Sequence, residues 1–161
     1  MKDNSFYIET YGCTSNKADS YIISNILSAS NYKVTTLENA QFIIINTCAV
    51  KEQTENKIKA RLKFLHEIYN NTPNIHVIIA GCLPHIAPNY IEIIKEIIPS
   101  FGAIIDLDNI RDLPQILEKI KNGNKGLILK SSQSVDKAQF YITHHPAKIT
   151  GIIPISEGCK G

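Results

Sequence analysis

The chain has 161 residues and a hydrophobic fraction of 43%, which is enough for one domain with a core of its own. Its 17 basic and 15 acidic side chains give a formal net charge of +2, which neither indicates nor excludes a nucleic-acid partner. The N-terminus lacks the apolar region of a signal peptide, and no apolar run approaches about 18 residues. We therefore expect a cytoplasmic protein with no membrane partner. We also expect this chain to be monomeric.

Short apolar runs alternate with stretches of helical period, which is typical of βαβ units on a parallel sheet. We expect an α/β fold with three layers, a flavodoxin-like or Rossmann-like open sheet of about five mostly parallel strands with helices on both faces. The expected strands are residues 6–10, 32–36, 42–46, 76–81 and 102–106. The expected helices are residues 15–30, 50–69, 90–98 and 113–123.

The sequence changes character after Gly123. No helical period persists beyond it, and short β-prone pieces alternate with serine, glutamine, histidine and proline. We interpret residues 1–123 as the domain and residues 124–161 as a connector that contains short strands.

Three of the four cysteines follow expected strands directly. Cys13 follows the first strand, Cys48 follows the apolar run "FIIIN", and Cys82 follows "HVIIAG". The carboxyl ends of parallel strands form one edge of a sheet, where ligands bind in such folds. If the strand order is 2-1-3-4-5, these three strands are neighbours and the outer two lie roughly 10 Å apart. The three thiols can then converge on one object.

The residues around the cysteines support this interpretation. Gly12 and Gly81 each precede a cysteine, and a residue without Cβ allows close approach of the backbone to a bulky group. Thr47, and Thr14 or Ser15, stand where helix N-caps are expected. The partial positive charge of a helix N-terminus would favour the thiolate form that binds metal.

Three interpretations of the cysteines remain open from spacing alone. They can be small core residues, since cysteine is often buried. They can bind zinc together with a fourth ligand such as His85, although separations of 35 and 34 residues differ from the close pairs of structural zinc sites. They can bind an iron–sulfur cluster, which tolerates dispersed ligands and normally takes four thiolates, so that three would leave one iron open.

A phosphate-handling role for Cys13 is disfavoured, because the loop after it lacks the glycines and the arginine expected in a phosphate-binding loop.

The segments "YGCTSNKADS", "NTCAVKEQTENKIKARL" and "AGCLP" resemble the N-terminal domain of the methylthiotransferases. These are radical S-adenosylmethionine enzymes that insert sulfur into an unactivated C–H bond and deliver a methylthio group. The resemblance covers about residues 6–120 and continues at "IPISEGCKG". The forms "NTCAVKEQTE" and "GCLP" are most similar to the archaeal and eukaryotic branch, which acts at C2 of N6-threonylcarbamoyladenosine in tRNA.

The resemblance implies that Cys13, Cys48 and Cys82 bind the auxiliary [4Fe–4S] cluster, which holds the sulfur to be transferred. Asn16 and Asn46 match the family patterns GCxxN and NxC. We expect these two residues to support the site through hydrogen bonds to its loops or sulfurs, together with Gly12 and Gly81.

The resemblance also assigns Cys159 to the radical domain, as the first cysteine of a CxxxCxxC motif. That motif holds a second [4Fe–4S] cluster, which binds S-adenosylmethionine and reduces it to a 5′-deoxyadenosyl radical. The sequence ends two residues later, at Gly161. We therefore expect a fragment of a tRNA-modifying enzyme that is inactive alone and whose auxiliary cluster can be absent or oxidised. The alternative is a flavodoxin-like binding domain whose cysteines only pack.

The expected second helix has a basic face that allows two interpretations. It can contact tRNA phosphates or be a solvated surface, and its acidic side chains favour the second. The basic residues of this helix are Lys51, Lys57, Lys59, Arg61 and Lys63.

Tyr11, just before the Gly-Cys pair, can pack against neighbouring strands or shield a cluster.

Overall fold

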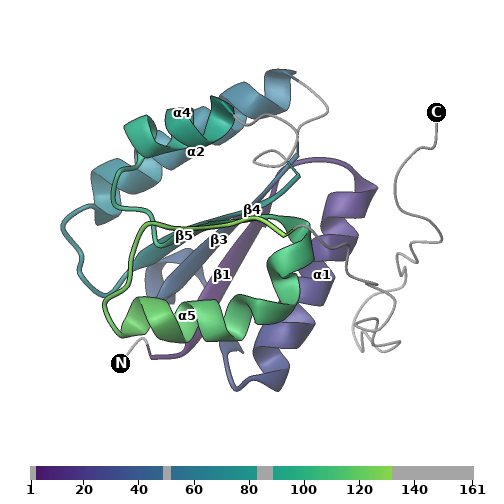
Figure 1. Cartoon of the computed structure of the whole chain (residues 1–161), viewed down its shortest axis with the longest axis vertical. Coiled ribbons are helices and arrows are strands. Elements are labelled where there is room, and N and C mark those ends of the chain that lie inside the picture. The colour runs from purple at the N-terminus through teal and green to yellow at the C-terminus, as the bar shows by residue number, and fades with distance from the viewer. Residues whose placement is uncertain (1–2, 49–51, 83–88, 132–161) are drawn as a thin grey trace.

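A sheet of six parallel strands lies at the centre of the fold (Figure 1). The computed structural model describes residues 3–48, 52–82 and 89–131. Within them the strand order is β2-β1-β3-β4-β5-β6. The strands are β1 (Ser5–Thr10), β2 (Lys33–Val34), β3 (Phe42–Thr47), β4 (His76–Gly81), β5 (Ala103–Ile105) and β6 (Leu127–Leu129). The expected α/β open sheet and its strand order are confirmed.

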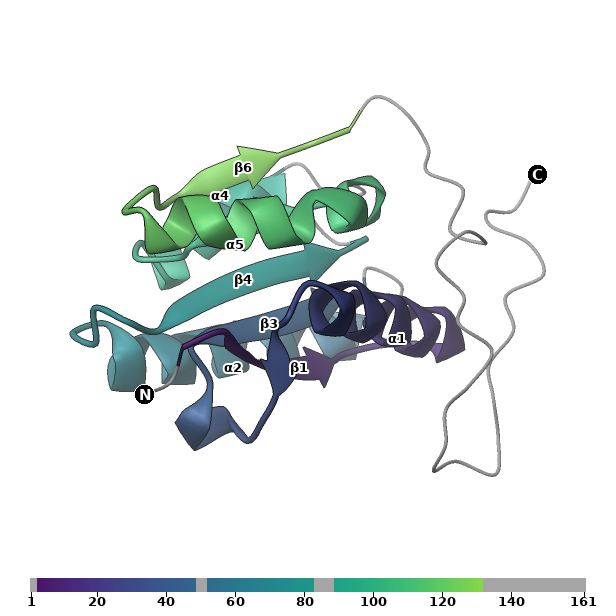
Figure 2. The same ribbon diagram turned by 90° about the horizontal axis from the view of Figure 1, so that it is seen from below.

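Helices cover both faces of this sheet, as Figures 1 and 2 show. One face carries α1 and α5, and the other carries α2 and α4. Among the described residues, no helix is both long and apolar enough to span a membrane. The α-helices are α1 (Thr14–Ala29), α2 (Glu52–Tyr69), α4 (Asn89–Ile97) and α5 (Leu113–Lys121), and two short 3-10 helices cover Leu37–Asn39 and Leu107–Asp112.

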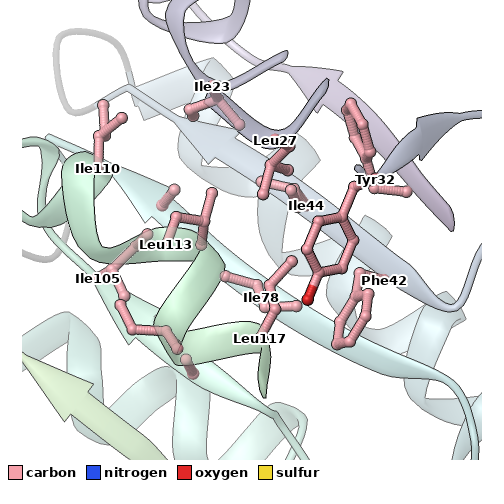
Figure 3. Close-up of a cluster of buried hydrophobic side chains, with 14 of the residues drawn as sticks. Ile23, Leu27, Tyr32, Phe42, Ile44, Ile78, Ile105, Ile110, Leu113 and Leu117 are labelled. Carbon is pink, nitrogen blue, oxygen red and sulfur yellow. The ribbon is translucent and has the colours of Figure 1, made fainter. Parts of the chain in front are cut away.

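The central strands are buried on both faces, which explains why they are continuous apolar runs in the sequence. Successive side chains point to opposite faces of the sheet. Ile44 and Ile78 therefore pack with Leu27 of α1 and Leu117 of α5 in one core cluster (Figure 3). Ile43, Ile45, Val77 and Ile79 pack with α2 and α4 in the other.

The sixth strand lies in the segment that the sequence analysis assigned to the connector. Leu127–Leu129 pairs in parallel with β5, at the edge of the sheet next to α5 (Figure 2). Its three side chains are only partly buried or exposed, so the apolar signal in the sequence is short and weak. Gly123, expected to end the preceding helix, follows the C-cap Asn122 with a φ of 94°.

Candidate metal centre

The register of the sheet aligns the ends of the strands that precede the cysteines. Asn46 of β3 is level with Thr10 of β1 on one side and with Ala80 of β4 on the other. Two residues after Thr10, Asn46 and Ala80 come Gly12, Cys48 and Cys82, in that order. Cys13 follows Gly12 directly. The structure thus brings all three predicted cysteines to the same edge of the sheet, on neighbouring strands.

Gly12 packs directly against Cys48. Its φ is 145°, and a Cβ built on it would lie 2.3 Å from Cβ and 3.0 Å from Sγ of Cys48. The same atom would lie 2.6 Å from Oδ1 of Asn16. Real side chains do not approach so closely, so only glycine lets the loop before Cys13 lie against Cys48.

Gly81 has the equivalent role between β3 and β4. Its φ is 115°, and a Cβ there would lie 2.2 Å from the carbonyl oxygen of Thr47. The backbone N–H of Cys82 donates to that oxygen at 3.3 Å, and Sγ of Cys82 lies 3.7 Å from it. Cys82 is therefore held against the residue that precedes Cys48.

Asn16 and Asn46 form a buried hydrogen-bond network beneath the thiols. Nδ2 of Asn16 donates to the carbonyl oxygen of Thr47 at 2.9 Å and to Oδ1 of Asn46 at 3.4 Å. Nδ2 of Asn46 donates to the carbonyl oxygen of Asn16 at 2.8 Å and to Oγ of Ser20 at 2.9 Å. The Cys13 thiol in turn donates to Oδ1 of Asn16 at 3.3 Å. These bonds tie the start of α1, which carries Cys13, to the end of β3, which leads to Cys48.

The expectation that threonine or serine caps the helices beside the thiols is wrong. The residue at the N-cap of α1 is Cys13 itself, not Thr14 or Ser15, and its side chain makes no capping hydrogen bond. Thr47 is the last residue of β3, and its hydroxyl donates to the carbonyl oxygen of Ala80 at 2.7 Å. Thr47 therefore links two strands instead of starting a helix.

The three thiols differ in exposure. Cys13 is exposed, Cys82 is partly exposed, and Cys48 is 3% exposed. In the described part of the chain, no three histidine, cysteine, aspartate or glutamate side chains are gathered into a group that could hold a metal ion. The residue types still suit an iron–sulfur cluster, because three cysteine sulfurs follow adjoining strand ends and two glycines permit close approach of the backbone. His85 and Cys159 lie outside the described residues.

A cavity of about 410 Å³ opens beside two of the thiols. Its polar lining includes Cys13 and Cys48 and also, from the first two turns of α2, Thr54 and Lys57. This position of Lys57 could not be predicted, because nothing in the sequence distinguishes Lys57 from the other lysines of α2. Among the described residues, Thr10, Tyr11 and Gly12 also line it.

A polar network anchors α2 to β1 next to this cavity. The Arg61 guanidinium donates to both carboxylate oxygens of Glu9, with Nε at 3.1 and 2.9 Å. The Tyr11 hydroxyl donates to Oε2 of Glu9 at 2.8 Å. Burial, and next the hydrogen bond to Glu9, raise the pKa of Tyr11 to about 12. Tyr11 both packs against the core and lines the cavity, so neither of its two predicted roles is excluded.

Comparison with known proteins places the chain in a family. Residues 5–102 match the family described as uncharacterized protein family UPF0004, which corresponds to the methylthiotransferase N-terminal domain. This chain belongs to that family. The matched residues include β1, β3 and β4 and the three cysteines that follow them.

Curated relatives cover almost the whole chain. A probable threonylcarbamoyladenosine tRNA methylthiotransferase of Methanothermobacter thermautotrophicus is 36% identical over 155 residues, which are 96% of this chain and 34% of the relative. A protein of the same name from Pyrococcus horikoshii is 33% identical, over 95% of this chain and 34% of the relative. A tRNA-2-methylthio-N(6)-dimethylallyladenosine synthase of Moorella thermoacetica is 28% identical, over 96% of this chain and 35% of the relative. The chain thus spans about a third of the length of the curated relatives it matches.

Proposed function

We propose that the chain is the part of a tRNA methylthiotransferase that binds its auxiliary [4Fe–4S] cluster, through Cys13, Cys48 and Cys82. The observation that carries the proposal is the position of these cysteines at the level ends of three neighbouring strands. Two relatives named as probable threonylcarbamoyladenosine tRNA methylthiotransferases match 95% or more of the chain, and one named as a tRNA-2-methylthio-N(6)-dimethylallyladenosine synthase matches 96% of it. The greatest identity quoted above, 36%, is to a protein named for threonylcarbamoyladenosine, which supports methylthiolation of that nucleoside at C2.

The residues of this chain would hold and orient the cluster. When bound, the cluster supplies the sulfur that is methylated and transferred. Cys48, which is buried, would hold the cluster from the protein interior, while Cys13 and Cys82, which are more exposed, would be the other two protein ligands. Gly12 and Gly81 let the three loops lie close together, and Asn16 and Asn46 keep the loop of Cys13 in register with the end of β3.

The proposal extends to residues beyond the described structure. Cys159 would be the first ligand of a second [4Fe–4S] cluster, which binds S-adenosylmethionine in the whole enzyme. Residues 1–161 alone would not carry out the transfer, because they supply only one cysteine for that cluster. The whole protein would act in the cytoplasm with tRNA as its partner, and this chain alone would be a monomer.

Anaerobic reconstitution with iron and sulfide tests the proposal. The wild-type chain should bind about four irons and show a broad brown absorbance. Changing Cys13, Cys48 or Cys82 to serine should remove most of that iron. The matched control is Cys159→Ser, which should bind as much iron as the wild type. Failure of the wild-type chain to bind iron would support a binding domain whose cysteines only pack.

A further inference from the structure

Tyr11 lines two cavities. One is the cavity beside Cys13 and Cys48, and the other, of about 560 Å³, lies along β1. Of the described residues, Thr10 and Tyr11 line both. Thr10 is exposed, whereas Tyr11 is partly buried and packs against the core cluster below α2. The larger side chain shared by the two cavities is therefore the ring of Tyr11.

The backbone of Tyr11 is fixed by the sheet. Its N–H donates to the carbonyl oxygen of Asn46 in β3 at 2.8 Å, which continues the pairing of β1 with β3 beyond Thr10. This bond does not involve the side chain of Tyr11. A change of that side chain should thus leave the path of the chain into Gly12 in place.

The ring of Tyr11 is held by Glu9. The two residues lie on the same side of the strand, and the Tyr11 hydroxyl donates to Oε2 of Glu9 at 2.8 Å. The Glu9 carboxylate is held in turn by the guanidinium of Arg61, which donates to both of its oxygens. Only 13% of the Glu9 side chain and 22% of the Arg61 side chain are exposed, so solvent screens this charge-assisted pair only in part. Arg61 of α2 therefore acts on Tyr11 through Glu9.

Cys48 is 3% exposed, although it lines a cavity. Gly12 packs on Cys48 but has no side chain with which to cover it. Among the described residues of that cavity, Tyr11 is the one with an aromatic ring. A ring fixed at the next position along the chain is thus suited to cover the Cys48 thiol.

We propose that the Tyr11 ring, held in place by Glu9 and Arg61, shields the Cys48 thiol from small molecules that enter the cavity along β1. Glu9 and Arg61 are positioning residues, because they act through the Tyr11 hydroxyl. The purpose of the shield rests on the proposed function, since Cys48 would be a cluster ligand. Its test does not, because shielding of a thiol is measured without metal.

Alkylation of the metal-free 161-residue chain by iodoacetamide tests the shield. The reagent is small and uncharged, and mass spectrometry of the resulting peptides gives the initial rate at each cysteine. Tyr11→Ala should raise the rate at Cys48 about threefold to tenfold. The rate at Cys13, which is exposed, should stay the same and is the internal reference.

Tyr7→Ala is the matched control. Tyr7 is also partly buried, packs against the same core cluster and lines the cavity along β1, but it is not among the described residues of the thiol cavity. This variant should leave the rate at Cys48 unchanged. Equal acceleration by Tyr7→Ala and Tyr11→Ala would overturn the inference, because general loss of packing would then expose the thiol.

Two further variants test the positioning by Glu9. Tyr11→Phe and Glu9→Ala remove the same hydrogen bond, so each should raise the rate at Cys48 by a similar factor, smaller than that of Tyr11→Ala. The double variant should be no faster than the faster single variant, since both changes act on one bond. Multiplied effects in the double variant, or no effect of either change, would overturn the role of Glu9.

The outcomes for the two proposals are separate. An unchanged Cys48 rate in Tyr11→Ala overturns the shield and has no bearing on iron binding. A wild-type chain that binds no iron overturns the proposed function, while the alkylation rates still decide whether Tyr11 shields Cys48.

Discussion

Asn16 and Asn46 hydrogen-bond to each other in both directions, across 30 residues of sequence. One lies in the first turn of α1, three residues after Cys13, and the other lies in β3, two residues before Cys48. Both are buried, and Asn46 is 0% exposed. The segments that carry two of the cysteines are thus joined through the side-chain amides of Asn16 and Asn46.

Removal of the Asn46 amide should destabilise the fold. Asn46→Ala leaves the carbonyl oxygen of Asn16 and the hydroxyl of Ser20 without this donor, and we expect a loss of about 1–3 kcal/mol in the free energy of unfolding. Urea denaturation measures this loss. Asn39→Ala is the control, because Asn39 is exposed and its side-chain amide donates to the hydroxyl of Thr36, only three residues earlier in the sequence. Equal effects of the two substitutions would mean that the network does not join α1 to β3.

Replacement of Gly12 by alanine should disturb the candidate metal centre more than replacement of Gly123 by alanine. Both glycines have positive φ, so alanine costs backbone strain of roughly 1–3 kcal/mol at either position. At Gly12 the new Cβ would also collide with Cys48, whereas at Gly123 no atom of the described residues lies within 4 Å of it. We expect Gly12→Ala to lose iron on reconstitution and Gly123→Ala to keep it. Full iron binding by Gly12→Ala would contradict the close packing of Gly12 on Cys48.

Acid should destabilise the fold through His76, at the start of β4. Burial, and to a smaller extent the charge of Lys125, lower the pKa of His76 to about 4, and the ring lies 5.5 Å from that of Phe42. Because this pKa lies below the unfolded value of about 6.5, the unfolded chain binds the extra proton between those values. The contribution of the neutral His76 ring to the free energy of unfolding is therefore fully present above about pH 6.5. The free energy of unfolding falls by up to about 3 kcal/mol as the pH drops to about 4.

Urea unfolding at several pH values, in the wild type and in His76→Phe, measures this contribution. Phenylalanine keeps a ring against Phe42 but has no proton to bind. The variant should lose less stability than the wild type between pH 6.5 and 4, with the remainder due to carboxylates that titrate in both chains. The same slope in the two chains would show that His76 is not the group responsible.

Much of the fold could be predicted because its central strands are buried on both faces. Phe42–Thr47 and His76–Gly81 are continuous apolar runs for that reason, and each of these two runs is followed by a cysteine. The edge strand Leu127–Leu129 was harder to recognise, since three half-exposed residues give almost no pattern.

The contacts within the site could not be predicted, because they join residues far apart in sequence. Arg61 and Glu9 lie 52 residues apart in the sequence, and nothing in the sequence identifies either residue as the partner of the other. Thr47 was misread as a helix cap because its position after an apolar run is the same for a cap and for a last strand residue. Its hydroxyl bonds to Ala80 on the neighbouring strand, a contact that requires the sheet to be formed.

We propose above that Cys13, Cys48 and Cys82 hold a four-iron cluster, and three protein ligands would leave one iron without one. Mössbauer spectroscopy of the reconstituted Cys159→Ser chain, with and without an added small thiolate, decides between this site and one without an open iron. About one iron in four should change its signal when the thiolate binds, while the other three keep theirs. A spectrum without a four-iron cluster, or one in which no iron responds to the added thiolate, would contradict the proposed site.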